Sequence, residues 1–207
     1  MENKNYFYPI GGLPSQQAIA SDKSIFTNAY AVIPKSVMRD IVVSYFPKWT
    51  KSRAWVLARP MTGFAETFSQ SIIEIAPNGG SADPEPDQRA ECVLFVLDGE
   101  LELKINNDNF ILVAGSYVYI PPKQNWTIFN RSDKLARLNW IRKIYSALEG
   151  IDPPEPFVKN DKDLEPVSMP QAGGVWSTTR FVDPLDIKHD MHVNIVSIKP
   201  GGVIPFM

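Results

Sequence analysis

The run Cys92-Val-Leu-Phe-Val-Leu-Asp-Gly-Glu-Leu-Glu-Leu-Lys-Ile105 decides the fold. Its first six residues are all apolar, which is typical of a strand buried on both faces. Asp98-Gly99 then makes a tight turn, and residues 100–105 alternate polar and apolar side chains, as a half-buried hairpin partner does. The run therefore predicts a β-hairpin within an all-β domain.

Similar short runs, separated by turn residues, continue on both sides of this hairpin. Pro and Gly occur 18 and 12 times in the 207 residues and punctuate these runs. The further expected strands are residues 29–33, 40–46, 53–58, 68–75, 110–113, 116–120, 126–130, 135–144 and 191–198, and turns are expected at 77–80 and 106–109. This spacing predicts a double-sheet barrel of the jelly-roll kind.

Composition and charge exclude several classes of protein. The net charge is −2 and the cations are interleaved with acids, which argues against a nucleic-acid partner. The N-terminus has no basic region followed by an apolar core, and no apolar run approaches the ~20 residues of a membrane span. A cytoplasmic protein without a membrane partner is expected. The single cysteine, Cys92, excludes an intramolecular disulfide and is expected to be a buried hydrophobe.

Two stretches have the residue spacing of the cupin motifs. The first motif begins with Gly, five residues and His-x-His. It continues with three or four residues, Glu, about six residues and a second Gly. This chain has Gly79, then Glu85 and Asp87 at the histidine positions, Glu91, and Gly99 after seven residues. The resemblance implies a cupin barrel, that is, a jelly roll or double-stranded β-helix, in which the ligand positions have lost their histidines.

The second motif is Gly, five residues, Pro-x-Gly, two residues, His, three residues and Asn. Here Gly115 is followed by Pro121-Pro-Lys123, Trp126 and Asn130 at the same spacings. Trp126 therefore stands at the third histidine position. The degenerate ligand positions in the two motifs are Glu85, Asp87, Glu91 and Trp126.

Two interpretations of the three acidic residues remain open. They could form an all-oxygen site for Mg²⁺, Mn²⁺ or Ca²⁺. Alternatively, they belong to a solvated loop at the mouth of a metal-free barrel, which we favour because Pro84 and Pro86 restrict the backbone and Trp126 would fill the space of an imidazole. The only histidines, His189 and His192, are three residues apart on an expected strand, so they should point to opposite faces and not share a metal.

Composition and a short repeat predict four segments. Residues 1–63 form an N-terminal arm with short strands, residues 64–145 a complete cupin domain without His ligands, and residues 146–172 a Pro-rich linker. Residues 173–207 are expected to begin a second, truncated cupin domain. The reason is that Asn-Ile-Val-Ser-Ile-Lys-Pro-Gly-Gly at 194–202 repeats Ser-Ile-Ile-Glu-Ile-Ala-Pro-Asn-Gly-Gly at 71–80.

The segments at 91–101, 115–122 and 190–202 resemble the bicupin (S)-ureidoglycine aminohydrolases. The resemblance implies Mn²⁺-dependent release of ammonia from (S)-ureidoglycine to give (S)-ureidoglycolate, a step of allantoin and purine catabolism. It also implies a homo-oligomer whose N-terminal cupin lacks metal ligands. The family's Mn²⁺ ligands, a Glu-x-His-x₃-His segment and a later Gln, would lie after Met207. No catalytic or metal residue is therefore expected within this chain, nor is a cofactor bound by it alone.

Two other functions remain open. A non-catalytic cupin module could bind a small ligand in its barrel or serve in oligomerisation. An acid-ligated dioxygenase is a weaker alternative, because non-haem iron sites normally use two His and one carboxylate.

Overall fold

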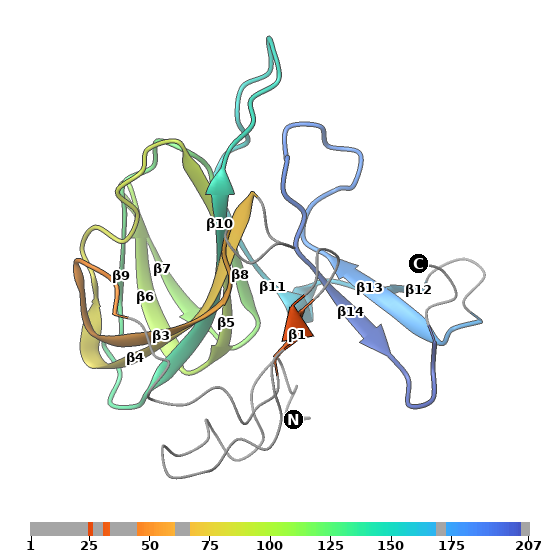
Figure 1. Cartoon of the computed structure of the whole chain (residues 1–207), viewed down its shortest axis with the longest axis horizontal. Helices are drawn as coiled ribbons and strands as arrows, with labels where there is room; N and C mark the ends of the chain where they lie inside the picture. Colours follow the sequence, from red (N-terminus) through yellow and green to blue (C-terminus); the bar gives the residue numbers. More distant parts are fainter. Residues whose placement is uncertain (1–24, 27–30, 34–44, 61–66, 169–172, 204–207) are drawn as a thin grey trace.

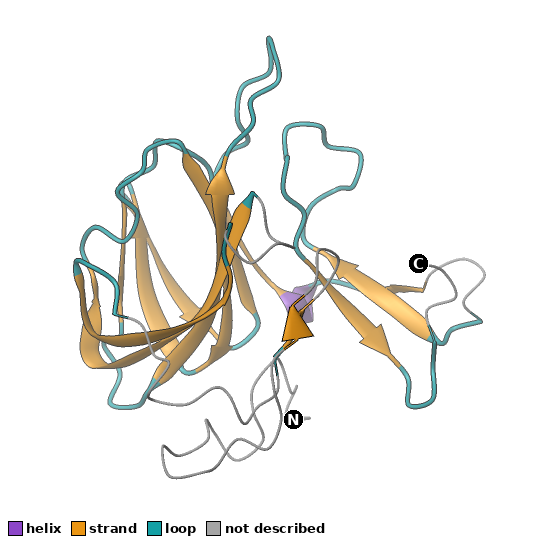
Figure 2. Cartoon of the chain, viewed as in Figure 1, coloured by secondary structure: helices purple, strands orange, loops and turns teal. Residues whose placement is uncertain are grey.

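The computed structural model describes residues 25–26, 31–33, 45–60, 67–168 and 173–203. Over these residues the chain consists of strands and loops with one short 3-10 helix (Figure 2). The predicted all-β fold is therefore confirmed. Of the strand expected at 40–46, residues 40–44 lie outside the described residues and residues 45–46 are in a loop. No helix in the described ranges is long and apolar enough to cross a bilayer.

A barrel occupies most of the described chain (Figure 1). Its strands are β3 Trp49–Ala58, β4 Phe68–Ser81, β5 Ala90–Asp98, β6 Glu100–Ile105, β7 Asp108–Val113, β8 Ser116–Ile120, β9 Trp126–Phe129, β10 Ala136–Ile144 and β11 Phe157–Asn160. They form one sheet in the order β11-β8-β5-β10-β4-β9-β6-β7, and β3 pairs with β4 beside this path. All pairings are antiparallel, as in a jelly roll. A separate antiparallel pair joins β1 Ile25–Phe26 and β2 Ala31–Val32.

Strand β4 helps to close the barrel because it pairs with different neighbours along its length. It pairs with β3 and β10 over most of its 14 residues, and Gly80 and Ser81 pair with β9. The turn predicted at 77–80 is wrong, because the strand continues through it. Asn78 and Gly80 take φ angles of 58° and 138°, so the strand is distorted without reversing. A Cβ on Gly80 would come within 2.1 Å of the backbone oxygen of Ile128, so only glycine fits.

Side chains of the barrel sheet enter two separate cores. Cys92 and Leu94 of β5 belong to the core inside the barrel. Val93, on the opposite face of the strand, belongs to a second core that includes Phe181 and Met191 from the C-terminal region. Because both faces of β5 are buried, its apolar run needs no polar alternation. The prediction of a fully buried strand is confirmed here.

The C-terminal region begins within the segment that was expected to be a linker. Strand β11 lies next to β8, and a 3-10 helix at Asp161–Asp163 follows it. The strands β12 Val167–Ser168, β13 Trp176–Arg180 and β14 Asn194–Ile198 then form a three-stranded antiparallel sheet. Strands β3 and β11 lie outside residues 64–145 in sequence and yet pair with strands of that segment. The division into four segments stays a prediction.

Candidate functional site

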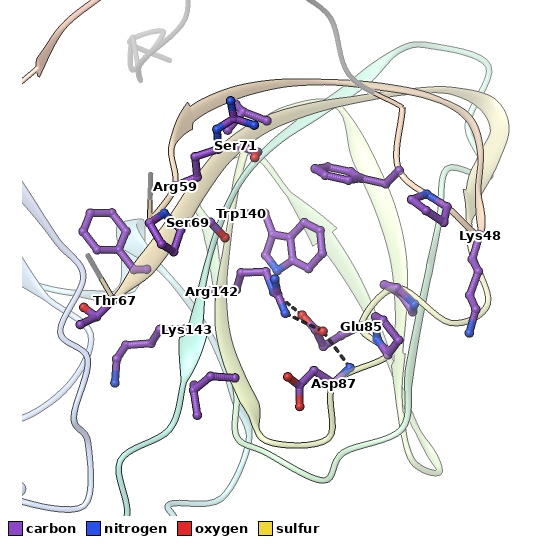
Figure 3. Close-up of a pocket in the computed structure, with 18 of the residues that line it drawn as sticks. Lys48, Arg59, Thr67, Ser69, Ser71, Glu85, Asp87, Trp140, Arg142 and Lys143 are labelled. Carbon is purple, nitrogen blue, oxygen red and sulfur yellow. Dashed lines mark hydrogen bonds and ion pairs between the residues drawn. The ribbon is translucent and has the colours of Figure 1, made fainter. Parts of the chain in front are cut away.

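A cleft of about 630 Å³ lies between the loop after β4, strand β10, the facing parts of β3 and β4, and residues 45–48. Figure 3 shows this cleft with parts of the chain in front cut away. The charged residues that line it are Lys48, Arg59, Glu85, Asp87, Arg142 and Lys143. Two of the four degenerate ligand positions, Glu85 and Asp87, thus border one cavity, whereas Glu91 and Trp126 are not among its lining residues.

Glu85 is held in this cleft by an ion pair with Arg142 of β10. The Glu85 side chain is only 6% exposed. Arg142 donates from Nη2 to Oε1 at 2.8 Å and from Nε to Oε2, so the contact is bidentate. Oε1 also accepts a hydrogen bond from the backbone N–H of Asp87 at 3.0 Å. Both carboxylate oxygens of Glu85 are therefore already engaged (Figure 3).

Asp87 is paired with a different arginine. Arg89 donates from Nε to Oδ1 at 3.0 Å and from Nη2 to Oδ2 at 2.8 Å. These hydrogen bonds, together with one from the Arg89 backbone, lower the pKa of Asp87 to about 2. The Arg89 side chain is 75% exposed, so this ion pair contacts solvent.

Trp126, at the third histidine position, belongs to the core inside the barrel. It is 6% exposed, and its ring centroid lies 6.3 Å from that of Trp140, edge to face. Phe46 and Trp49 also contact Trp140, each with ring centroids 5.6 Å apart. This aromatic cluster occupies the barrel interior beside the cleft and supplies no metal-binding atom, because an indole only donates a hydrogen bond.

Glu91 lies on the outer face of the sheet, away from the cleft. Its Oε2 accepts a hydrogen bond from the Tyr119 hydroxyl at 2.7 Å, and its Oε1 lies 3.6 Å from Lys143 Nζ. Its neighbour Cys92 points into the barrel instead, where burial raises the pKa of the thiol. The first motif allows four residues before its Glu, and with that spacing six residues separate Cys92 from Gly99. The interior position at this point of the motif is therefore occupied by Cys92.

The residues at the degenerate ligand positions do not fit a metal ion. Two carboxylates are paired with arginines, the third lies on the other face of the sheet, and the fourth position holds an indole. Among the described residues, no group of three or more His, Cys, Asp or Glu side chains is arranged to hold a metal. The Mn²⁺ of the resembled family therefore finds no ligand set in this barrel.

A second polar cluster joins the outer face of the barrel to the loop before β14. Lys143 and the backbone N–H of Ser146 both donate to Oδ2 of Asp190, the latter at 2.6 Å. The pKa of the fully buried Glu91 is raised to about 8. Burial is the main cause, and the Asp190 carboxylate is the second. Burial would raise the pKa of Asp190 as well, but hydrogen bonds with Glu91 and Lys143 lower it. At neutral pH this arrangement favours a protonated Glu91 next to an ionised Asp190.

The two histidines lie in the loop before β14 rather than on a strand. The prediction that they point to opposite faces of a strand is wrong, because β13 pairs only with residues 194–198. The His189 and His192 rings have centroids 6.3 Å apart, and Nε2 of His192 lies 3.2 Å from the backbone oxygen of His189. Burial lowers the pKa of His189, whose ring meets Tyr119 edge to face at 4.6 Å.

Sequence reasoning did not single out Arg142, although it is the partner of Glu85. The available signal was its place in the alternation of β10, because Leu138, Trp140 and Arg142 share one face of the strand. A charged residue in line with two buried apolar residues marks a site where the strand meets a buried charge or a cavity. Without the fold, however, the chain gave no indication of which face of β10 lies inside.

Comparison with known proteins identifies the family. The family model of the cupin domain matches residues 71–142. A solved structure, that of a Pseudomonas aeruginosa protein described as glyoxylate-induced, shares 52% sequence identity with the chain. The similarity covers 98% of this chain and 73% of that protein, with a TM-score of 0.87. The chain belongs to the cupin family of this Pseudomonas protein. The predicted cupin barrel is thereby confirmed.

Two more distant similarities extend this result. The (S)-ureidoglycine aminohydrolase of Escherichia coli is 24% identical over 175 residues, which are 84% of this chain. The chain spans 64% of the length of that curated relative. The protein Ylba from E. coli is 23% identical and has a TM-score of 0.74 over 88% of this cupin and 69% of that structure, which supports the fold alone.

Proposed function

We propose that the protein acts in the Mn²⁺-dependent release of ammonia from (S)-ureidoglycine, which gives (S)-ureidoglycolate in allantoin degradation. The observation that carries this proposal is the similarity to the curated (S)-ureidoglycine aminohydrolase over 84% of the chain. The 52% identity to a second cupin protein of greater length is compatible with it.

In this proposal the barrel described above is the metal-free half of a cytoplasmic, homo-oligomeric bicupin. Its role is structural, because Glu85, Asp87, Glu91 and Trp126 are engaged in ion pairs, hydrogen bonds or the barrel core and supply no metal site. Strand β14 and the Pro200-Gly201 turn would open the second cupin, and the Mn²⁺ ligands would follow after Met207. The second barrel would then carry the chemistry.

The test combines a mass and an activity. The intact mass of the protein isolated from its source cells is measured first. Its release of ammonia from (S)-ureidoglycine is then measured with Mn²⁺ and after treatment with EDTA. We expect a mass larger than that of the 207-residue chain and ammonia release that EDTA abolishes and Mn²⁺ restores. The 207-residue chain itself serves as the control and should show no Mn²⁺-dependent turnover. A source protein that releases no ammonia above the uncatalysed rate, with Mn²⁺ present, would sink the proposal.

A second candidate function is a non-catalytic module that binds a small ligand. The cleft of about 630 Å³ favours it, since ligand sites commonly measure ~300–1,000 Å³. Binding of small ligands to the 207-residue chain, followed by calorimetry and by shifts of the amide signals of cleft residues, tests this candidate independently of any turnover.

A further inference from the structure

The cleft combines an apolar wall with a few polar groups, the composition that small-molecule sites usually have. Apolar side chains that line it come from residues 45–47, from β3, β4 and β10, and from the loop after β4. They include Phe46, Val56, Phe68 and Trp140. The hydroxyl groups of Ser69 and Ser71 belong to the same lining.

Register across the sheet brings the serines next to the arginine. Ser69 of β4 is the direct cross-strand partner of Arg142, and Ser71 is the partner of Trp140. Directly opposed residues on antiparallel strands have Cβ atoms about 5 Å apart and share a face of the sheet. Figure 3 shows Ser69, Ser71, Trp140 and Arg142 around one cavity. The hydroxyls, the indole and the guanidinium therefore form one continuous surface.

Arg142 has donors that its partner does not use. Glu85 accepts from Nε and Nη2, and Nη1 makes no hydrogen bond to any residue in the described part of the chain. A guanidinium carries five N–H donors, two of them on Nη1. The Arg142 side chain is 34% exposed, whereas that of Glu85 is 6% exposed, so the arginine is the member of the pair that reaches the open space.

The pair with Glu85 also orients the guanidinium. A bidentate contact fixes the plane of the arginine fork, which lowers the entropy lost when a ligand binds to the remaining donors. A nearly buried ion pair is weak evidence for stability, because apolar residues of the same volume often stabilise a fold as well or better. A role in ligand binding is therefore compatible with this ion pair.

The lining of the cleft carries charges of both signs. Its cations are Lys48, Arg59, Arg142 and Lys143, and its carboxylates are Glu85 and Asp87. Each of these carboxylates is already compensated by a bidentate arginine, Arg142 for Glu85 and Arg89 for Asp87. Lys48 is likewise paired with Asp83, and Lys143 with Asp190, so the charges of the lining are largely compensated within the protein. An entering anion would therefore be recognised by the unused donors on Nη1 of Arg142 and not by an excess of positive charge.

We propose that this cleft binds a small organic carboxylate. Its carboxylate would accept hydrogen bonds from Nη1 of Arg142 and from the hydroxyls of Ser69 and Ser71. Its flat or apolar body would lie against Trp140 and Phe46. This assignment names the ligand class for the second candidate function above and rests on that function. It is independent of the aminohydrolase activity.

The test compares benzoate with benzamide, which have the same shape and differ in charge. Calorimetry on the 207-residue protein should show saturable benzoate binding at least about tenfold tighter than benzamide binding, the range expected for a hydrogen-bonded charge. Arg142→Lys retains a positive charge beside Glu85 but removes the planar fork, and should weaken benzoate binding by about tenfold or more.

A second variant tests carboxylate binding if Arg142→Lys does not fold. Ser69→Leu fills the space opposite Arg142, leaves the ion pair in place and should abolish benzoate binding. Ser168→Leu, at an exposed position of β12, is the matched control and should bind benzoate like the parent. Unchanged benzoate binding in Ser69→Leu would overturn the proposal. Benzamide binding as tight as benzoate, and blocked by Ser69→Leu, would overturn the carboxylate assignment but leave a ligand-binding module. Absence of benzoate binding would overturn the carboxylate assignment, whereas the ligand-binding module is tested by the calorimetry with other small ligands.

Discussion

The two copies of the repeat, at 71–80 and 194–202, have similar sequences and different surroundings. Ile75 of β4 is fully buried, at 0% exposure, whereas Ile198, its counterpart in β14, is 48% exposed. Strand β4 has β3 on one side and β10 on the other, and it contributes to cores on both faces. Among the described residues, β14 pairs only with β13. The repeat therefore determines a strand that leads into a Pro and Gly pair, and the neighbours determine how much of it is buried.

The largest expected effect distinguishes the glycine with a positive φ in each of the two copies. Gly80→Ala should destabilise the protein by about 4 kcal/mol or more, because its Cβ would clash with backbone on β9 and its φ is positive. Gly201 also has a positive φ, of 77°, but no atom lies within 4 Å of its added Cβ. Gly201→Ala should thus cost only about 1 kcal/mol of backbone strain. Urea denaturation of both variants measures the difference, and equal losses would contradict the comparison.

The next effect concerns the matched isoleucines. Ile75→Ala should lower the free energy of unfolding by about 2–5 kcal/mol, because it leaves a cavity in the barrel core. Ile198→Ala should lower it by less than about 1 kcal/mol, because the side chain is half exposed. The measurement is again urea denaturation. A large loss in Ile198→Ala would mean that β14 is covered in solution, and its dependence on protein concentration would then reveal whether a second copy covers it.

A third effect, which accumulates gradually with pH, reports on the contact between the barrel and the C-terminal region. The pKa of Glu91 rises from 4.5 to about 8 on folding, so the folded chain keeps a proton that the unfolded chain loses between these pH values. The stabilisation is complete below about pH 4.5 and is lost as the pH rises towards 8. Because of Glu91, each rise of one pH unit within this window should therefore lower the free energy of unfolding by up to about 1.4 kcal/mol. Glu91→Gln, which stays neutral, should remove that slope.

The pH experiment needs controls because other groups titrate near Glu91. His189, with its lowered pKa, acts in the opposite direction below its ordinary pKa of 6.5, and Asp190 and Lys143 contribute charges to the same contact. The difference between the parent and Glu91→Gln isolates the glutamate. Asp87→Asn is the matched control, because the pKa of Asp87 is about 2 and it is already ionised in this window. Parallel pH profiles for the parent and Glu91→Gln would rule out the protonated glutamate.

The sequence predicted the barrel well where the local pattern was strong. Strand β8 has the predicted bounds, and β5 extends the predicted run by two residues at one end and one at the other. The prediction failed at Asn78 and Gly80, because residues typical of a reversal also allow a bulge in a continuous strand. It also failed for His189 and His192, because only the pairing with β13 decides where β14 begins.

Only part of the candidate site could be predicted from the sequence, for a related reason. The motif spacing located Glu85 and Asp87 in the loop that borders the cleft. It placed Glu91 at the position of the motif's glutamate ligand, yet a shift of one residue along a strand exchanges the two faces of a sheet, and Cys92 is the residue that lies inside. Arg142 is 57 residues away from Glu85 in the sequence, so their pairing arises only when β10 is placed in the barrel.

By itself, the amino-acid sequence determined the fold class, the main strands of the barrel and the loss of histidine ligands at the cupin positions. These follow from alternation, turn residues and spacing, which are local properties. Only the tertiary structure decided which face of each strand is inside, which arginine compensates each carboxylate, and that the buried Glu91 lies beside Asp190. Those contacts join residues far apart in the chain, and their energies depend on burial, which no local pattern specifies.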